Sequence, residues 1–340
     1  MATAAPSPLK FLMPGWFALV MGLCGLALAW HAAAPWLGEL ANGVALVIGA
    51  LAAGVFGVLA LASLWRWQRH PAALADDLRH PVRHAFVATV PVSLLLLATL
   101  AHALGLSGWG VRGLWWAGSL LQWWATLWVL GRWLAPADGA AAGTPAPGLW
   151  PSVTPVLFIP VAGNVVAPLA GIGLGHGLWA AAQFGIGLLF WPVVLSLVLA
   201  RRIAHGPLPD RLLPAWAITV APPAVVGIAL LRWNAPLPVV GALWGMALFA
   251  ALWVGAQARR IASQPFGIPF WALSFPLAAL TVLTLQLGSA TGLAGYQTLG
   301  LGLLALTSLV IVGLCLVTWR GLRNGSLLAP EPVATLTPAP

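Results

Sequence analysis

Long apolar runs, separated by short polar or basic stretches, occupy almost the whole chain. Each run approaches the roughly 20 residues that an α-helix needs to cross the hydrocarbon core of a bilayer. The pattern therefore predicts an all-α integral membrane protein with about ten transmembrane helices. The expected spans cover residues 12–30, 40–64, 85–104, 114–134, 151–173, 178–200, 212–231, 239–257, 270–287 and 296–319.

The composition agrees with lipid as the surrounding solvent. Of the 340 residues, 61% are hydrophobic and 6% are charged, and the mean hydropathy is +0.96, whereas about a quarter of an average soluble domain is charged. The spans leave no room for a separate catalytic domain, and no cluster of nucleophile, base and acid can be named, so we expect no enzyme. We expect one membrane domain over residues 12–320, with a cytoplasmic tail at 1–11 and a disordered tail at 321–340.

The basic residues predict the orientation of the chain. When the 15 Lys and Arg residues are assigned to alternate sides of ten spans, all except Arg112 and Arg232 fall on one side. Cytoplasmic connections carry the positive excess in membrane proteins, so both termini are expected in the cytoplasm. The net charge of +9 does not indicate a nucleic-acid partner, because the charges are scattered between apolar runs instead of gathered on one soluble face.

Prolines favour alternate spans, and this pattern predicts the arrangement of the helices. A proline inside a helix removes a backbone hydrogen bond and bends the axis, and the freed backbone groups cannot face lipid. The odd-numbered spans should therefore form five kinked inner helices around a central pore, each paired with a straighter outer helix in one of five helical hairpins. The prolines of the odd spans are Pro14, Pro91, Pro160, Pro168, Pro222, Pro223 and Pro276, whereas Pro192 is an exception in an even span.

The expected membrane interior contains no ionisable residue, because the Asp, Glu and His residues fall at span ends or in connections. Proton or sodium coupling usually relies on such groups within spans, and haem or metal sites need clustered ligands. We therefore expect a neutral pore without a cofactor or metal. The basic residues at its inner mouth favour small anions as the permeating ions, although any single arginine could serve only to orient the chain.

Neutral polar residues on the odd spans could contact an anion in such a pore. Hydroxyl and amide donors suit an ion that must enter and also leave, and we expect Asn164, Thr219 and Ser274 to line the pore. Each could instead bond a backbone carbonyl near a proline, which is the commoner role of such residues in spanning helices. The same alternatives apply to Thr89, Ser93, Thr281 and Thr284.

Phe275 is the candidate gate. It precedes Pro276 in a span that is expected to line the pore. A bulky apolar ring in a narrow pore excludes water from an ion and can close the pore by dewetting. Packing between helices is the alternative role, and it is the role of most phenylalanines in a protein of this kind.

Several motifs, considered together and in order, resemble those of the bacterial tellurite-resistance and dicarboxylate transporter family, which also contains the plant guard-cell slow anion channels. None of them is a catalytic signature, so the resemblance lies in their order and spacing. The motifs are PGWF at 14–17 with Met21, Gly22, Gly25 and Leu26, HPVRHAF at 80–86, Phe190 with Trp191, APPA at 221–224 and FWALSFPL at 270–277.

The resemblance implies a homotrimer in the bacterial inner membrane, in which each subunit has its own pore of five inner helices. It implies that a phenylalanine on the ninth helix closes this pore, and Phe275 is the matching residue. Gly15 matches the small residue that the family places against that ring. The kinked inner helices of the family match the prolines of the odd spans, Pro14, Pro91, Pro160, Pro222 and Pro276.

Two functions remain open at this stage. The first is a passive anion channel or uniporter that passes small inorganic anions through a neutral pore gated by Phe275. The second is a proton-coupled transporter of dicarboxylates or of an oxyanion such as tellurite, with the proton carried by a histidine near a span end, such as His84 or His102. A membrane-embedded enzyme or a scaffold has little support in the sequence.

Overall fold

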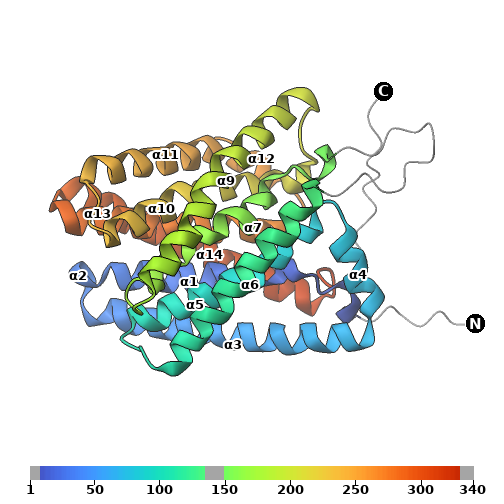
Figure 1. Ribbon diagram of the computed structural model, residues 1–340, viewed down its shortest axis with the longest axis horizontal. Coiled ribbons are helices and arrows are strands. Elements are labelled where there is room, and N and C mark those ends of the chain that lie inside the picture. The colour runs from blue at the N-terminus through green and yellow to red at the C-terminus, as the bar shows by residue number, and fades with distance from the viewer. Residues whose placement is uncertain (1–7, 135–148, 330–340) are drawn as a thin grey trace, which may run out of the picture.

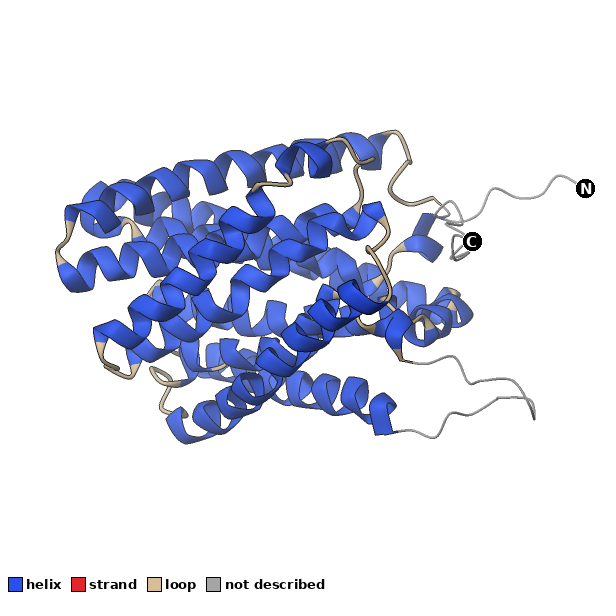
Figure 2. Ribbon diagram, turned by 90° about the horizontal axis from the view of Figure 1, so that it is seen from above, coloured by secondary structure: helices blue, strands red, loops and turns tan. Residues whose placement is uncertain are grey.

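The computed structural model describes residues 8–134 and 149–329, and within these ranges every regular element is a helix (Figures 1 and 2). The helices form pairs in sequence order. In each pair, a segment that begins as a 3-10 helix packs against a long helix that follows it. The all-α membrane class expected from the apolar runs is confirmed.

The first member of each pair is an inner segment. Four of the five inner segments are long and apolar enough to cross a membrane. In these four, 67–83% of the most apolar window is buried inside the molecule. The five inner segments are η2 Pro14–Phe17 with α1 Ala18–Ala32, η3 Arg83–Ala88 with α5 Thr89–Ala103, the series η5 Pro155–Leu157, α7 Phe158–Ala162, η6 Gly163–Val166 and α8 Pro168–Gly171, η7 Asp210–Val220 with α10 Ala221–Arg232, and η8 Ile268–Leu273 with α13 Ser274–Thr291.

The second member of each pair is an outer helix. In four of the outer helices, only 17–28% of the most apolar window is buried. In Figure 1, α3 and α11 lie along opposite edges of the molecule. The outer helices are α3 Glu39–Arg69, α6 Trp109–Leu134, α9 Gly177–Ala204, α11 Leu237–Gly255 and α14 Ala294–Arg323. The remaining short helices are η1 Pro8–Phe11, α2 Ala34–Leu37, α4 Pro71–Arg79, η4 Trp150–Ser152 and α12 Ala258–Ala262.

The inner segments form a closed ring in sequence order. Helix α1 packs against α5, α5 against α7 and α8, α8 against α10, α10 against α13, and α13 returns to α1. Each outer helix packs on the outside of its own inner partner, as α3 does on α1 and α14 on α13. The ring of five inner segments inside five outer helices agrees with the arrangement expected from the prolines.

Prolines mark the change from 3-10 to α-helix in the inner segments. Pro91, Pro160, Pro223 and Pro276 are each the third residue of an α-helix, and Pro222 precedes Pro223. In the first turn a missing N–H costs no hydrogen bond, because that group has no partner within the helix. The helix can therefore begin at these residues, and a tighter 3-10 segment precedes it. The associated bend of each axis stays a prediction.

Two inner prolines and one outer proline depart from this position. Pro14 begins the 3-10 helix η2 four residues before α1, and Pro168 begins α8. Pro192 lies inside α9, which continues through it from Gly177 to Ala204. The outer helix thus accommodates its proline without a break, whereas the inner segments change helix type at theirs.

The exact number of membrane crossings stays a prediction. Eight helices of the described chain are long and apolar enough to cross a membrane, and Pro155–Gly171 is a shorter apolar helical stretch. Helix α6 has 26 residues and carries seven tryptophans, and it is not among the eight. The five inner and outer pairs are consistent with ten crossings but do not establish that number.

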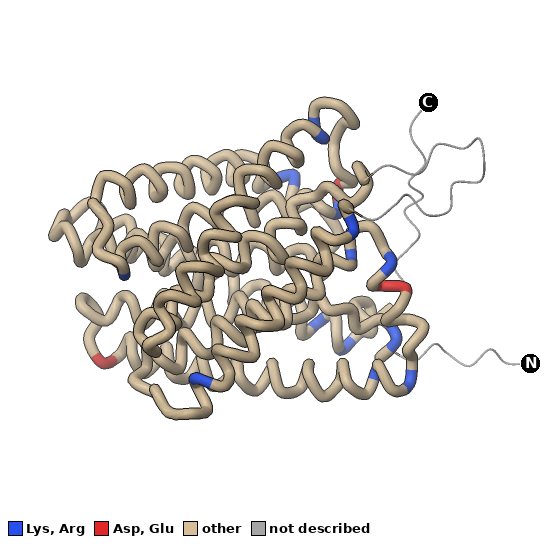
Figure 3. Tube along the Cα trace, viewed as in Figure 1, with Lys and Arg blue, Asp and Glu red and all other residues tan. Residues whose placement is uncertain are grey.

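Most of the basic residues lie at one end of the bundle (Figure 3). Hydrogen bonds join several of them there, since Arg66 donates to the carbonyl oxygen of Lys10 and Arg132 donates to that of Leu78. Arg112 and Arg232 are at the opposite end of their helices, near the start of α6 and the end of α10. This distribution matches the charge separation on which the expected orientation depends.

The chain beyond residue 320 differs in part from the expected disordered tail. Helix α14 continues to Arg323, and the N–H of Leu327 donates to the carbonyl oxygen of Gly321, where the Leu327 side chain also packs. The prediction of disorder is therefore wrong for residues 321–329, because Leu327 and Leu328 pack against the hydrophobic core. Residues 330–340, like residues 1–7 of the other expected tail, lie outside the described residues.

Candidate functional site

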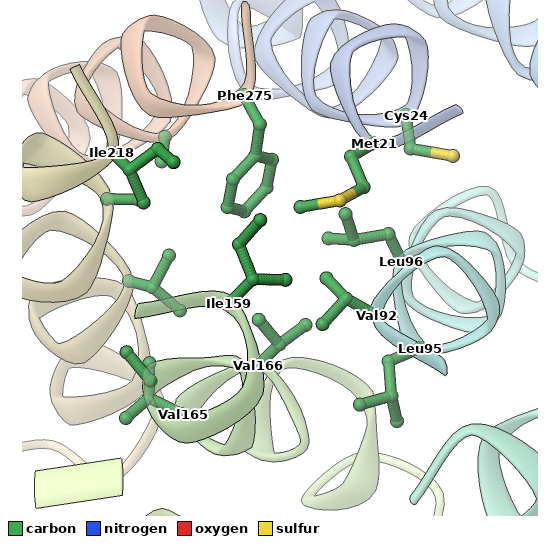
Figure 4. Close-up of a cluster of buried hydrophobic side chains, with 14 of the residues drawn as sticks. Met21, Cys24, Val92, Leu95, Leu96, Ile159, Val165, Val166, Ile218 and Phe275 are labelled. Atoms are coloured by element: carbon green, nitrogen blue, oxygen red, sulfur yellow. The ribbon is translucent and has the colours of Figure 1, made fainter. Parts of the chain in front are cut away.

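Apolar side chains from all five inner segments meet at the centre of the ring. One residue from each segment contributes, namely Met21, Val92, Ile159, Ile218 and Phe275, and Figure 4 shows these side chains pointing toward one another. All five residues are nearly buried, with at most 8% of their surface exposed. We call this set the apolar ring. It contains no polar atom that could replace the water around an ion.

Phe275 lies between two cavities. The small cavity, of about 70 Å³, lies on the side of the 3-10 segments, and the large cavity, of about 540 Å³, lies on the side where the inner helices end. Phe275 and Val225 are the two residues that line both cavities. The side chain of Phe275 is therefore part of the wall of both cavities.

The wall of the small cavity is almost entirely apolar. Its lining residues come from η3, η5, η7 and η8 as well as from the α-helices that follow, and none of them is charged. Phe86, Val156, Leu212 and Ile268 are examples from the four 3-10 segments. On this side of Phe275 the wall therefore carries no charged side chain.

The wall of the large cavity carries polar groups, and here the expectation of a neutral wall needs correction. Arg232 at the end of α10 lines this cavity, together with His31 and His102. The Nδ1–H of His31 donates to Oδ1 of Asn42 over 3.0 Å. The sequence placed these groups correctly at the ends of spans, but the cavity reaches far enough toward the ends to include them.

Small residues and one hydrogen bond fix Phe275 at the start of α13. The hydroxyl of Ser274 donates to the carbonyl oxygen of Trp271 over 2.6 Å, which ties α13 to η8. Trp271 is itself anchored, since its indole N–H donates to Thr318 on the outer helix α14. Gly25 on α1 lies against the ring, because a Cβ placed there would be 3.2 Å from Cδ2 of Phe275.

Gly15 does not occupy the position that the resemblance implied. The atoms nearest to a Cβ on Gly15 belong to Phe86 and Met13, and Gly15 lines neither cavity. Gly25, ten residues further along the same segment, is the glycine beside Phe275. We therefore assign to Gly25 the small residue that was expected against the ring.

The polar residues expected in the pore are engaged elsewhere. Asn164, Thr219 and Ser274 line neither cavity. Thr219 donates to the carbonyl oxygen of Trp216, and Ser274 donates to that of Trp271. The alternative role, in which these groups satisfy backbone carbonyls, describes them better than a contact with an anion. Thr89, Ser93, Thr281 and Thr284 also donate to backbone carbonyls.

Asn164 belongs to a buried polar network between the third inner segment and the outer helices α6 and α9. Its Nδ2 donates to Thr126 over 2.8 Å and to the carbonyl oxygen of Val161 over 2.9 Å, and its Oδ1 accepts from Nε2 of Gln183 over 3.1 Å. From the outer helix α6, Nε2 of Gln122 donates to the carbonyl oxygen of Pro160 over 2.8 Å. The network supplies partners to the backbone where α7 ends and η6 begins.

The glutamines of this network were not expected from the sequence. Gln122 and Gln183 are each a polar amide in a largely apolar outer helix, and both are fully buried. Such a residue needs a hydrogen-bond partner in a membrane, which is the signal that could have identified them. Their partners include the carbonyls and the Asn164 amide of the interrupted third inner segment.

Comparisons of the sequence with known proteins place the chain in a family. The family model SLAC1, described as a voltage-dependent anion channel, matches residues 12–319. A protein of Methanocaldococcus jannaschii described as an uncharacterised transporter is 25% identical over 291 residues, which cover 80% of this chain and 82% of that protein.

Relatives from a plant and a bacterium carry more specific descriptions. The S-type anion channel SLAH2 of Arabidopsis thaliana is 23% identical, over 71% of this chain and 46% of the plant protein. The tellurite resistance protein TehA homolog of Haemophilus influenzae is 24% identical, over 78% of each chain. The resemblance drawn from the sequence motifs is thereby confirmed. With its apolar helices and a family match over nearly all of its length, the chain is a multi-pass membrane protein that belongs to the SLAC1 family of anion channels and transporters.

Proposed function

We propose that this protein is a passive anion channel or uniporter that passes small inorganic anions through the ring of five inner segments and is gated by Phe275. The observation that supports the proposal most strongly is the position of Phe275, which belongs to the apolar ring and lines both cavities. The family match to anion channels supports the choice of ion.

The apolar ring would act by excluding water. An ion in the large cavity can keep its hydration shell, but the apolar ring offers no polar group to replace that shell. Apolar constrictions of this kind close a pore by dewetting. Movement or removal of the Phe275 side chain would join the two cavities and lower the barrier to an ion.

The test is anion flux through the full chain reconstituted in proteoliposomes. Phe275→Ala should raise the flux on the order of 100-fold, which corresponds to about 2.7 kcal/mol at 1.36 kcal/mol for each factor of ten. Phe184→Ala is the matched control, because Phe184 is equally buried but packs against Trp233 and lines neither cavity. Unchanged flux in correctly inserted Phe275→Ala protein would overturn the gate.

The same proposal includes the setting of the channel. We propose a homotrimer in the bacterial inner membrane, with both termini in the cytoplasm and residues 12–320 as one membrane domain. The gathering of basic residues at one end supports the orientation, and the family resemblance supports the trimer. Native mass spectrometry of the purified protein would test the trimer, and labelling of cysteines placed in the terminal segments of a chain without other reactive thiols would test the orientation.

A second candidate function is a proton-coupled carrier of a dicarboxylate or an oxyanion such as tellurite. One observation favours it, because His102 lines the large cavity with an Nδ1 atom that is buried and has no hydrogen-bond partner among the described residues. His84, the other candidate, lines neither cavity and is hydrogen-bonded to the carbonyl oxygen of His80. A reversal potential that shifts with pH would favour the carrier, whereas one that follows the anion gradient alone would favour the channel.

A further inference from the structure

The small cavity has a wall that offers water almost nothing to bind. Among its described lining residues, Trp271 alone has a polar atom in its side chain, and that indole N–H already donates to the hydroxyl of Thr318 over 2.9 Å. A water molecule inside a protein needs about two to four polar partners. The small cavity therefore favours an apolar occupant over water.

The cavity lies within the bundle, and all five inner segments contribute to its wall. None of the described lining residues is exposed, and most are buried. Aromatic rings form part of the wall, which is typical of sites that bind apolar ligands, and small residues leave the space between them. The rings are Phe86, Phe158, Trp271 and Phe275, and the small residues are Ala18, Ala162, Gly163, Ala215, Ala221 and Ala272.

The volume of about 70 Å³ limits the size of the occupant. An apolar cavity of roughly 150 Å³ stays dry and binds benzene or xenon, and the small cavity has about half of that volume. A single large atom or a hydrocarbon of a few carbon atoms fits this space. Such an occupant leaves water at no polar cost, whereas an ion would lose hydration that the wall does not replace.

The large cavity provides the internal comparison. Its volume is about 540 Å³, and its wall includes His31, Gln286 and Arg232. These side chains can form hydrogen bonds with water, so an apolar molecule would have to displace bound water there. A small apolar probe should therefore select the small cavity, although the large cavity offers more room.

We propose that the small cavity is a binding site for a small uncharged apolar molecule, and that its occupant blocks the passage on the side of the 3-10 segments. The occupant contacts Met21, Ile218 and Phe275 of the apolar ring, which line this cavity. An anion that enters from this side has to displace it. The block rests on the proposed function, whereas the binding itself does not require conduction.

Xenon is the probe, and diffraction from crystals of the full chain under xenon pressure locates it. In the wild-type protein, its anomalous scattering peak should lie in the small cavity and not in the large one. Ala215→Val adds two methyl groups at the wall of the small cavity. This substitution should lower the xenon occupancy at least about threefold, because a packed interior leaves no room for the atom.

Ala217→Val is the matched control. Ala217 lies in the same segment, η7, and is 4% exposed, compared with 2% for Ala215. It packs with Val254 and Ile261 and lines neither cavity. The xenon occupancy of Ala217→Val should therefore equal that of the wild-type protein.

Anion flux tests the block in a variant that conducts according to the proposed function. In proteoliposomes with Phe275→Val, the xenon pressure that fills half of the sites in crystals of the same variant should lower the flux about twofold. Adding Ala215→Val should remove this sensitivity, whereas adding Ala217→Val should retain it. The comparison separates xenon in the cavity from xenon dissolved in the lipid.

The site would be overturned by the absence of a xenon peak from the wild-type small cavity, by a stronger peak in the large cavity, or by equal occupancy in Ala215→Val. The wild-type peak decides the matter if Ala215→Val does not fold. A peak in the small cavity together with flux that xenon does not lower would reject the block and keep the site. The absence of anion flux from Phe275→Val, with xenon bound, would reject the proposed channel and keep the site.

Discussion

The inner segments are less apolar than the outer helices and yet far more buried. Four inner segments have 67–83% of their most apolar window buried, against 17–28% for four outer helices, although these outer helices have the higher hydropathy. In water the more apolar set would occupy the interior. In a bilayer the lipid tails are as apolar as leucine, so hydrophobicity does not draw a helix inward, and small or polar residues do. The comparison shows lipid acting as the solvent of this fold.

The inner segments carry the features that this solvent selects for burial. Gly22 and Gly25 bring α1 close to α13, and Asn164 bonds to groups on two outer helices. The outer helices expose large apolar side chains such as Leu61 and Phe249. The predicted effects of substitutions therefore differ between a buried position and its exposed counterpart.

The largest expected effect on stability concerns the buried ion pairs of Asp77, which connect α4 to α3 and η3. Asp77 on α4 accepts from Arg66 of α3 over 2.7 Å and from Arg83 of η3 over 3.2 Å, and the Asp77 and Arg66 side chains are only 5% and 4% exposed. Asp77→Ala should cost about 3–5 kcal/mol, because it leaves a buried guanidinium without its carboxylate. Thermal unfolding in detergent measures the change.

The exposed counterpart of the Asp77 ion pairs is the ion pair between Asp210 of η7 and Arg260 of α12, in which both side chains are 53% exposed. Asp210→Ala should cost less than about 1 kcal/mol, because water screens the pair. A loss in the free energy of unfolding as large as that of Asp77→Ala would show that burial does not determine how much these ion pairs contribute.

A smaller effect is expected at the contact of α1 with α13. A methyl group on Gly22 would overlap the side chain of Ser274, so Gly22→Ala should destabilise the fold by about 1–3 kcal/mol. On the outer helix α3, nothing lies within 4 Å of a Cβ placed on Gly54. Gly54→Ala should therefore be neutral or stabilise the protein by up to about 1 kcal/mol. Equal unfolding temperatures for the two variants would contradict the close contact.

Among the buried positions, the smallest effect is expected in the polar network around Asn164. Asn164→Leu removes the hydrogen bonds to Thr126, Val161 and Gln183. The expected cost is about 1 kcal/mol, because hydrogen bonds between helices in a membrane contribute modestly. Ser263→Ala, which removes a hydrogen bond within an exposed turn, is the control. A stable Asn164→Leu protein with unaltered unfolding would show that the network does not support the interrupted third inner segment.

The sequence predicted the helices and their division into two sets better than it predicted the site. Runs of about 20 apolar residues mark spans directly, and the prolines correctly separated inner from outer segments. Which face of an inner segment meets the axis depends on its rotation, and the inner segments are buried on all sides, so no polar face marks it. For this reason the sequence did not reveal Gly25 as the glycine beside Phe275, where the resemblance implied Gly15, and Ser274 was expected in the pore although it bonds to Trp271.

The sequence also did not show how far the large cavity extends along the axis of the bundle. Arg232, His31 and His102 were correctly placed at the ends of spans, but the extent of the large cavity depends on how α1, α5, α10 and α13 separate toward their ends. Phe275, in contrast, was named as the candidate gate because it precedes Pro276 in an inner span and matches the phenylalanine that the resemblance places on the ninth helix, and its role as a gate stays a prediction. Resemblance supplied what the apolar pattern lacked.

Anion flux through a size series at residue 275 tests the central claim most directly. Phe275→Leu, Phe275→Val and Phe275→Ala should raise the flux in that order, because each step removes more of the side chain that separates the two cavities. The same three substitutions at Phe249, which is 69% exposed on the outer helix α11, should leave the flux at the wild-type value. Equal flux across the series at residue 275, in protein that inserts and elutes as the wild type does, would contradict a gate at this side chain.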